Sequence, residues 1–269
     1  MVADSRVGNV AATSLLVERS GRRNFVPLAR RFLQQRGPGG GPAPLSWFVR
    51  AHRQRALQLY LLAHGLASVE PYDVGMPARV WAAALGLPDS DSARVSISDS
   101  WSWLEQHQLV RTARDGRLRR IWLLDDAGTG VPYTHGDATT KRDYFKLPYT
   151  FWFEGWNENL DLPATAVLLI AMSLRQSFSL PHERGGEWYG ISRDTIRRGV
   201  AQLREHELLT MRTTWKATAN SPTGATEDRR YTLTGPFAAE KRRAQPRAAS
   251  GKSAAAVATG GLRDLPGSS

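Results

Sequence analysis

Apolar and polar positions follow a helical period over residues 191–209, ISRDTIRRGVAQLREHELL. Three apolar residues recur at three- and four-residue spacing and predict one buried stripe: Ile196, Val200 and Leu203. Ser192 precedes the stripe and is suited to cap the helix, because its hydroxyl can accept a hydrogen bond from a free backbone N–H. Arginines occupy the opposite face. β-prone runs follow at Leu208–Thr214 and Arg229–Leu233, so the pattern predicts a helix and then a two-stranded ribbon.

The same pattern occurs earlier in the chain. Leu104–Val110 (LEQHQLV) aligns with Leu203–Leu209 (LREHELL) without a gap. The register, extended backwards, pairs four further positions: Ile97 with Ile196, Trp101 with Val200, Arg94 with Arg193, and Ser98 with Arg197. Val110–Arg114 then turns at Asp115-Gly116 into Leu118–Leu124, and Asp-Gly between alternating runs is a strong hairpin signal. An internal repeat of this kind predicts two copies of one domain.

Helix, tight turn, helix and ribbon is the order of a winged-helix domain. We therefore expect a mainly α fold with small β-ribbons (α+β), built as two tandem winged-helix domains with disordered tails. The expected boundaries are a disordered basic tail and linker at 1–44, a first winged helix at 45–126, a linker at 127–143, a second winged helix at 144–238 and a disordered basic tail at 239–269.

Periodicity and end signals place the other helices at Leu45–Ser68, Pro77–Leu85, Ser92–His107 and Pro163–Phe178. A short helix is compatible with Phe25–Leu33 inside the N-terminal tail. Ala217–Asp228 reads as a long, mobile polar insertion in the second ribbon. Tyr144–Trp156 is dense in aromatic residues. One interpretation is that these side chains stack on nucleic-acid bases. The other is that they fill the seam between the two domains or belong to a strand of the second domain. Burial is favoured, because aromatic clusters dominate protein cores.

The distribution of charged residues adds to this interpretation. The formal net charge is +11, but residues 1–44 hold seven basic and two acidic residues and residues 239–269 hold six and two, so the tails carry +9 of it. Local clusters therefore matter more than the total. There is no cysteine, which excludes disulfides, a thiol nucleophile and cysteine-bound zinc. No apolar run is long enough to span a bilayer and no secretory signal is visible, so we expect a soluble, cytoplasmic, nucleoid-associated protein without membrane contact.

The later helix and ribbon supply one set of candidate DNA contacts. Arg193 and Arg197 lie one turn apart near the N-terminal half of the helix and are expected at base edges, since the arginine fork can bond guanine O6 and N7 together. Phosphate contacts are expected from four more residues: Arg198, Arg204, Arg212 and Lys216. The alternative for each is a solvated face with intrahelical ion pairs.

The earlier copy is a weaker candidate for recognising a DNA sequence. Its helix offers only Arg94, Ser96 and Ser98, and Asp99 beside them would be repelled by the DNA backbone. Its ribbon compensates with five arginines within residues 111–120: Arg111, Arg114, Arg117, Arg119 and Arg120. Arg114, Arg117 and Arg119 are the expected contacts, the last two projecting together beside the turn. This domain either binds DNA through its ribbon or serves partly as a protein interface. An exposed Trp103 would contribute to such an interface, although core packing is the favoured role for Trp103.

Catalysis has little support. The six histidines include no pair two or four residues apart, so neither a His-x-His metal pair nor an H-E-x-x-H helix exists. His182 and Glu183 begin a polar loop that is more readily a solvated turn than a metal site. We expect no catalytic residue, cofactor or metal.

One family resemblance adds to these inferences. Tyr144–Pro148 (YFKLP), the helix over Leu160–Leu174 and Ser192–Leu209 together resemble the N-terminal winged helix of RepA-type plasmid replication initiators, over about a third of the chain. The resemblance implies binding of repeated origin sites in double-stranded DNA, recruitment of host replication proteins, and base contacts from Arg193, Thr195 and Arg197. The polar insertion in the second ribbon and the arginine-poor first helix depart from that family.

The expected function is therefore non-enzymatic, site-specific binding of double-stranded DNA, first as a replication initiator of a plasmid or other mobile element. A transcriptional regulator would need the same helices and remains the near alternative, with host transcription proteins as partners. A non-catalytic protein–protein adaptor built on winged helices is the alternative of another class. Oligomeric state and target sequence stay open.

Overall fold

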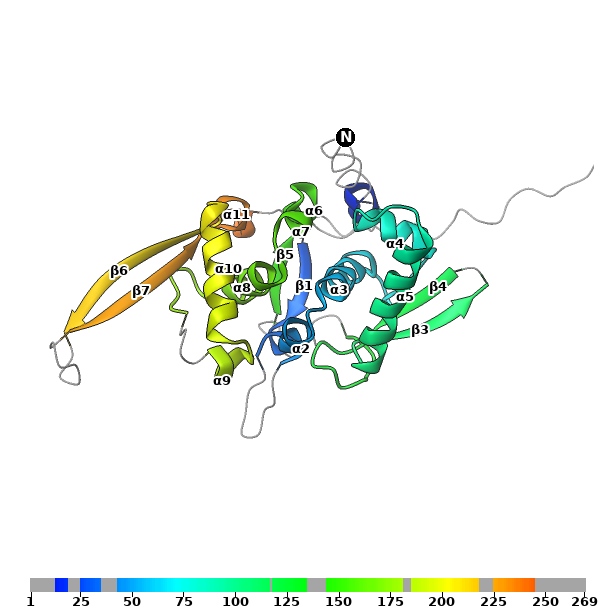
Figure 1. The fold of residues 1–269 in the computed structure, drawn as a ribbon, viewed down its shortest axis with the longest axis horizontal. Coiled ribbons are helices and arrows are strands. Elements are labelled where there is room, and N and C mark those ends of the chain that lie inside the picture. The colour runs from blue at the N-terminus through cyan, green and yellow to red at the C-terminus, as the bar shows by residue number, and fades with distance from the viewer. Residues whose placement is uncertain are drawn as a thin grey trace, which may run out of the picture.

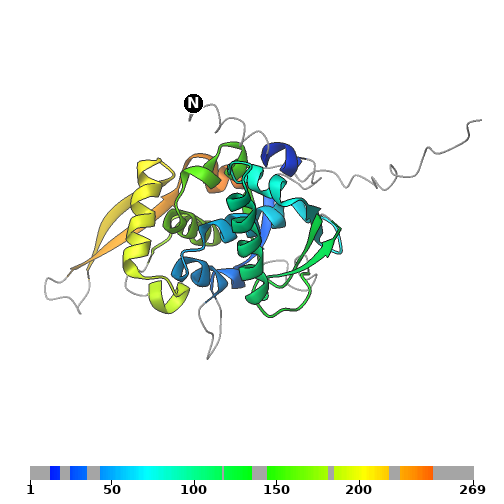
Figure 2. The same ribbon diagram turned by 45° about the vertical axis from the view of Figure 1, so that its right-hand side comes forward.

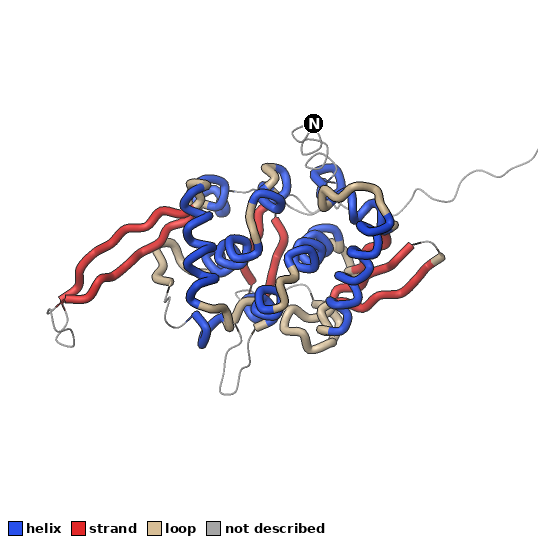
Figure 3. Tube along the Cα trace, in the orientation of Figure 1, coloured by secondary structure: helices blue, strands red, loops and turns tan. Residues whose placement is uncertain are grey.

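A computed structural model of the chain describes residues 13–18, 25–34, 43–116, 118–134, 144–180, 185–217 and 225–244. Within them the fold is mixed α and β, with more helix than strand, and its sheets are small and antiparallel (Figures 1 and 3). The predicted α+β class is confirmed.

From residue 44 onward, the first half of the chain has two helices where the sequence predicted a single one over Leu45–Ser68. The chain reverses between them at His52, whose φ is +52°. A strand that the sequence did not reveal, β2, follows, and it joins the ribbon as a third strand in the order β2-β4-β3. The elements of this half are α2 (Pro44–Arg50), α3 (Gln54–Leu66), β2 (Asp73–Met76), α4 (Ala78–Ala84), α5 (Asp91–Gln106), β3 (Val110–Asp115) and β4 (Leu118–Leu123).

The second half has a similar order. Its long helix α8 begins at a side-chain cap, since Asp161 accepts a hydrogen bond from the Ala164 amide, and it ends at Ser173 rather than at the predicted Phe178. The strands of its ribbon have nine residues each, longer than predicted, and include 225–228 of the expected insertion. Its elements are β5 (Tyr144–Pro148), α6 (Thr150–Phe153), α7 (Trp156–Asn159), α8 (Leu162–Ser173), α9 (Gly185–Tyr189), α10 (Arg193–Glu205), β6 (Leu209–Ala217), β7 (Ala225–Leu233), the 3-10 turn η2 (Gly235–Phe237) and α11 (Ala239–Ala244).

The two halves repeat each other in the register that the sequence alignment gave. His107 and His206 are the C-caps of α5 and α10, and Gln108 and Glu207 next to them both have positive φ. The hydrogen bonds that close the two helices are equivalent: Leu109 N to Leu104 O (3.1 Å) and Leu208 N to Leu203 O (2.8 Å). In the first half, β2 pairs with β4, with Val74 opposite Ile121. At the corresponding place, the second half has a single antiparallel β-bridge between Phe178 and Tyr231.

A two-stranded sheet joins the halves. β1 (Phe25–Ala29) pairs antiparallel with β5. β1 packs on α3 of the first half, and β5 packs on α8 of the second half (Figure 1). The buried side chains of both halves form one continuous hydrophobic cluster. In Figure 1 α5 and α10 lie on opposite flanks of this centre, and in both ribbon views the β3–β4 and β6–β7 ribbons project away from it at opposite ends (Figures 1 and 2).

Parts of the two expected tails belong to the fold. Phe25–Leu33 is not a short helix but β1 followed by the 3-10 turn η1 (Arg30–Phe32), and Val26, Leu28 and Phe32 are fully buried, because alternate apolar residues fill the space beside β5. Residues 13–18 are helical, and Thr13 Oγ1 donates to the Ala84 carbonyl at 2.6 Å. The expected tail 239–269 likewise begins as helix α11. Residues 1–12 and 245–269 lie outside the described part.

A buried polar group ties the segment after β4 to the centre of the molecule. The Asp126 carboxylate accepts hydrogen bonds from the Ala29 amide and from the Tyr60 hydroxyl, each at 2.7 Å, and lies 3.2 Å from His64 Nε2. Burial opposes ionisation of Asp126, but the His64 charge and these hydrogen bonds hold the pKa of its carboxyl below the usual value. The described part of the predicted linker, 127–134, follows directly on this anchor and packs Tyr133 into the core.

Candidate nucleic-acid interface

Four polar contacts and one close approach hold α10 in place. Ser192 caps the helix by accepting from the Thr195 amide at 3.2 Å, as predicted. Before it, the chain turns at Gly190 (φ +65°), whose carbonyl accepts from Arg50 Nε at 2.9 Å. In its last turns, Gln202 bonds both the Asn159 carbonyl (3.3 Å) and the Asp161 amide (3.1 Å). Gly199 lies directly against the first turn of α8. The helix is thereby fixed on its inner face and at both ends.

The outer face of α10 carries a stripe of arginines. At 100° per residue, Arg193, Arg197 and Arg204 lie within about 40° of one another around the helix axis, and Arg198 lies roughly 100° further round. All four are exposed, while Ile196, Val200 and Leu203 are buried as predicted. Arg197 forms an ion pair with Asp194 at 2.8 Å. The other three arginines have no hydrogen bond or ion pair within the described part of the chain.

Thr195 has a local role at the helix start. It is only half-exposed, and its hydroxyl lies 2.9 Å from the Ser192 hydroxyl, inside the cap. At 100° per residue it lies about 160° round the helix axis from both Arg193 and Arg197, on the other side of the helix from the arginine stripe. The Thr195 hydroxyl that lies in this cap is the same group that the family resemblance assigns to a base contact.

The β6–β7 ribbon extends this basic surface. Arg212 is exposed and lies opposite Arg230, which binds Asp228 at 3.1 Å, while Arg229 binds Glu227 at 2.8 Å. Burial raises the pKa of the Tyr231 hydroxyl at the ribbon base, and the positive charges of Arg229 and Arg204 act against that rise. The Lys216 side chain lies outside the described part. One feature escaped the sequence analysis: Trp215 is 71% exposed, which no periodicity could signal.

In the first half, the candidate residues of α5 are already engaged. Arg94 binds both Asp89 (2.6 Å) and Asp91 (2.8 Å). The Ser96 hydroxyl accepts a hydrogen bond from Arg55. The Ser98 hydroxyl and carbonyl accept from Arg119 at 3.0 and 3.4 Å. The helix that corresponds to α10 therefore presents no unpaired cation within the described residues.

The arginines of the β3–β4 ribbon divide between its two faces. Arg114 and Arg119 lie directly opposite each other on the face that carries Ile121 toward α5. On the other face, the Arg111 and Arg120 guanidinium groups lie 4.5 and 5.9 Å from the Trp122 ring centroid, and Arg120 binds Asp73 at 3.0 Å. Arg117, which was expected to project beside Arg119, lies outside the described part.

The aromatic candidates are in the core. Trp103 is 8% exposed and stacks on His107 with centroids 3.9 Å apart, so the favoured interpretation of core packing is confirmed and the alternative of an exposed contact surface at Trp103 is not. In the aromatic segment, Phe151 and Trp152 are buried in the seam between the halves, as the core interpretation predicted. Their rings are not accessible for stacking on bases.

No cluster of three or more His, Asp or Glu side chains able to hold a metal ion occurs among the described residues, and His182 and Glu183 lie outside them. No helix in the described part is both long and apolar to the degree that crossing a membrane requires. No protein-family model matches the chain, and no curated protein matches it either.

Proposed function

We propose that the protein binds double-stranded DNA at specific sites and that each half of the chain is a winged-helix domain. Helix, strand, helix, helix and ribbon follow in this order in the first half, with β2 paired to the last strand of the ribbon. The Phe178–Tyr231 bridge takes the place of β2 in the second half. In helix-turn-helix domains of this kind a recognition helix enters the major groove. α10 has that position in the second half.

The observation that carries the proposal is the arginine stripe on α10. A B-DNA major groove admits one α-helix, and the exposed stripe lies on a flank of α10, roughly 70° round the axis from the buried residues Ile196, Val200 and Leu203. Arg193 and Arg197, in the N-terminal half of the helix, are assigned to base edges. Arg198, Arg204 and Arg212 are assigned to phosphates, because they lie beside or beyond the part of the helix that enters the groove first.

We assign sequence reading to the second half alone. The α5 counterpart of Arg193 is Arg94, which two aspartates neutralise. Asp99 and Glu105 add exposed negative charge to the same helix, and this repels a phosphate backbone. The first half then contributes shape and stability to the complex rather than base recognition.

The biological role that we propose is replication initiation on a plasmid or other mobile element, together with host replication proteins. It rests on the resemblance to RepA-type initiators, whose matching segments form β5, α8 and α10 here. Transcriptional regulation would use the same contacts and differs in where the DNA site lies. Both roles are non-enzymatic and place the protein on the nucleoid in the cytoplasm. The adaptor alternative loses its main surface, because Trp103 is buried.

The test is selection of bound duplexes from a random pool by the full-length protein. Heparin at about physiological salt suppresses non-specific binding by the basic ends of the chain. The expected result is an enriched motif, whose genomic positions, at origins or at promoters, separate the two roles.

A matched pair of variants then tests the contact. Arg193→Ala should weaken binding to the selected site by roughly 1–3 kcal/mol and relax specificity at one base pair. Arg94→Ala, at the equivalent position of α5, should leave binding unchanged, because its guanidinium is held by Asp89 and Asp91. Equal binding by parent and Arg193→Ala, or the absence of any enriched motif, refutes the proposal.

A further inference from the structure

An exposed indole lies on the outer part of the β6–β7 ribbon. Trp215 is near the far end of β6, and most of its surface is accessible to solvent. Alternate residues of a strand share a face, and Trp215 shares one with Leu209 and Met211 and, across the ladder, with Tyr231 and Leu233. At the base of the ribbon this face packs on the body of the protein, because Leu209 and Tyr231 are buried. Further out the same face becomes exposed at Trp215.

The surroundings of this indole are polar. Its cross-strand neighbour is Glu227, and both oxygens of that carboxylate accept hydrogen bonds from Arg229, at 2.9 and 2.8 Å. The carboxylate beside the indole is therefore paired within the ribbon. Among the described residues of the ribbon, Trp215 is the single large apolar side chain that is exposed. A protein interface has an apolar core around such an anchor, and this face does not provide one.

The indole N–H of Trp215 is available as a donor, since it forms no hydrogen bond within the described residues. A planar ring with an N–H at its edge matches the minor groove of A·T pairs. That groove is about 6 Å wide and presents only acceptors at A·T pairs, adenine N3 and thymine O2. A G·C pair adds the guanine 2-amino group there, which is itself a donor and cannot accept from the indole.

The length of the ribbon fits this groove. Trp215 is six residues beyond Leu209, where β6 begins, which corresponds to about 20 Å of strand. Half a turn of B-DNA, the distance along the axis from the centre of a major groove to that of the next minor groove, is about 17 Å. Arg212 lies halfway along this path, at about 10 Å, where the sugar-phosphate backbone separates the two grooves.

We propose that Trp215 lies edge-on in the minor groove next to the major groove that α10 enters, and that its indole N–H donates to adenine N3 or thymine O2. The residue then selects A·T over G·C at one position of the site, about five base pairs from the pair that Arg193 contacts. This inference rests on the proposed function, since it places the ribbon on the same duplex as α10. It adds a second point of base reading to a ribbon otherwise assigned to phosphate.

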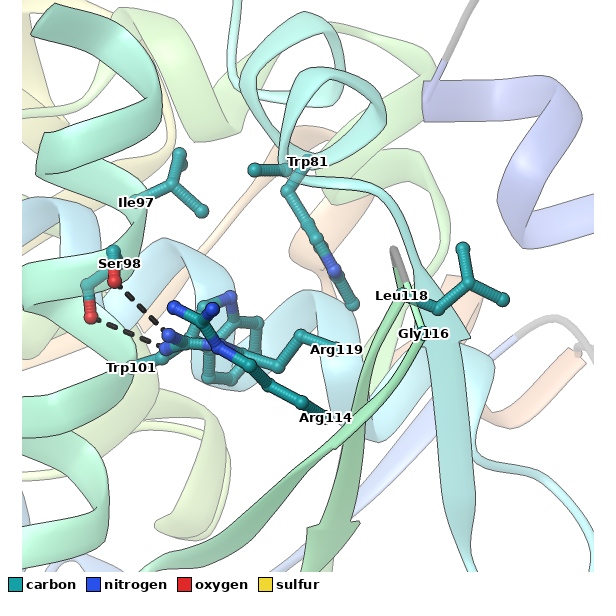
Figure 4. Close-up of a pocket in the computed structure, with 9 residues that line it drawn as sticks. Trp81, Ile97, Ser98, Trp101, Arg114, Gly116, Leu118 and Arg119 are labelled. Carbon is teal, nitrogen blue, oxygen red and sulfur yellow. Dashed lines mark hydrogen bonds between the residues drawn. The ribbon is translucent and has the colours of Figure 1, made fainter. Parts of the chain in front are cut away.

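The β3–β4 ribbon of the first half lacks these features. Its strands have six residues each, against nine in β6 and β7. Arg114 and Arg119 share a cavity beside α5, and Arg119 folds back to donate to the Ser98 hydroxyl and carbonyl (Figure 4). Trp122 of this ribbon is half-buried, and its ring centroid lies 4.5 Å from the Arg111 guanidinium. The minor-groove contact is therefore assigned to the second half, which also contains α10.

The experiment measures binding of the full-length protein to the selected duplex by fluorescence anisotropy of labelled DNA. Each A·T pair about four to six base pairs from the Arg193 position is replaced in turn by G·C or by inosine·C. Inosine·C presents the major-groove groups of G·C but lacks the 2-amino group in the minor groove. At one position we expect G·C to weaken binding about tenfold and inosine·C to stay within about twofold of A·T.

Three variants test whether Trp215 is the reading group. Trp215→Phe keeps an aromatic ring without the N–H, and Trp215→Ala lacks both. Each should bind the A·T and G·C duplexes within about twofold of each other. Trp188→Ala removes the other exposed tryptophan of the described residues, on α9, and should keep the preference of about tenfold. Trp215 is exposed, so its replacement does not threaten the fold.

Four results would overturn the inference. The first is a selected site without an A·T preference at this distance. The second is inosine·C bound as weakly as G·C, which would place the reading in the major groove. The third is a Trp215→Phe variant that keeps the parental preference, because the N–H is then not the reading group. The fourth is unchanged binding by Trp215→Ala, which would leave the indole to a protein partner.

Failure of the proposed function is distinguishable from failure of this inference. The α10 proposal fails if no motif is enriched or if Arg193→Ala binds as tightly as the parent. An enriched motif that depends on Arg193 but not on Trp215 refutes the minor-groove contact alone.

Discussion

Gly199 is the residue whose change should most directly disturb α10, the proposed recognition helix. A Cβ atom at this position would lie 2.4 Å from the Pro163 carbonyl oxygen and 2.7 Å from Val167 Cγ2. The oxygen belongs to the backbone of α8 and cannot rotate away, so α10 would have to retreat by about 1 Å to restore an ordinary contact. The equivalent residue in α5 is Ser100, buried and also small, where that helix packs on α3.

The magnitude for Gly199→Ala follows from two opposing terms. Overpacking costs typically about 1–3 kcal/mol, and a backbone contact this short places the cost in the upper half of that range. Alanine in place of glycine in a helix contributes about 1 kcal/mol in the other direction. The net expectation is a loss of roughly 1–2 kcal/mol in the free energy of unfolding. Binding to the selected DNA site should weaken as well, because Arg193 and Arg197 move with the helix.

Gly186→Ala is the matched control. Gly186 lies in α9 without positive φ, and a Cβ there meets nothing within 4 Å. This variant keeps the propensity gain without the clash, so urea denaturation should find it as stable as the parent or up to about 1 kcal/mol more stable. If Gly199→Ala is as stable as Gly186→Ala, the close contact between α10 and α8 is not what holds the recognition helix in place.

Two further predictions concern carboxylates. Asp126→Asn should cost about 3 kcal/mol at pH 7, because the buried amide replaces a paired carboxylate. The pKa of Asp126 is lowered in the folded state, so its stabilising contribution is complete above the unfolded value of about 3.9 and is lost as the pH falls toward the folded one. Urea unfolding of parent and variant should therefore converge in acid, and a gap that widens below about pH 4 would contradict this sign. Asp194→Asn should release Arg197 from its ion pair and tighten binding to the selected site, because the Arg197 fork no longer has to leave a carboxylate to reach its base edge; an unchanged Kd in a DNA titration would mean that Arg197 does not contact a base.

Periodicity predicted α10 and α5 well, because their apolar stripes are buried against a single neighbouring layer. The Leu-x-x-His-x-Leu pattern at both C-termini carried the repeat, and the structure shows that it encodes one local geometry, with a histidine cap and a residue of positive φ. Asp115-Gly116 marked the first turn correctly. β2 was missed, since a four-residue strand containing Gly75 has neither the length nor the alternation that reveals a strand.

For the candidate DNA contacts, the sequence showed which side chains could bind DNA but did not show which of them are already bound within the protein. Arg94 and Arg193 are equivalent in the register, yet the first faces Asp89 and Asp91 and the second faces solvent. The same holds for Ser98, whose hydroxyl is occupied by an arginine 21 residues later in the chain. The Ser98 pairing depends on how the ribbon folds back on the helix, and no local pattern records it. The partners of Arg94 lie only three and five residues away, so their spacing was present in the sequence.

The sequence by itself determined the local elements: the amphipathic helices, their serine and aspartate caps, and the repeat that makes the two halves alike. Those features depend on contacts within a few residues, and spacing encodes them. Only the tertiary structure decided that Phe25–Ala29 is a central strand rather than part of a tail, because its partner β5 lies more than a hundred residues away. It also decided which arginines are available and which share a cavity. Side chains distant in the chain compete for the same partners, and that competition is resolved only when the elements pack.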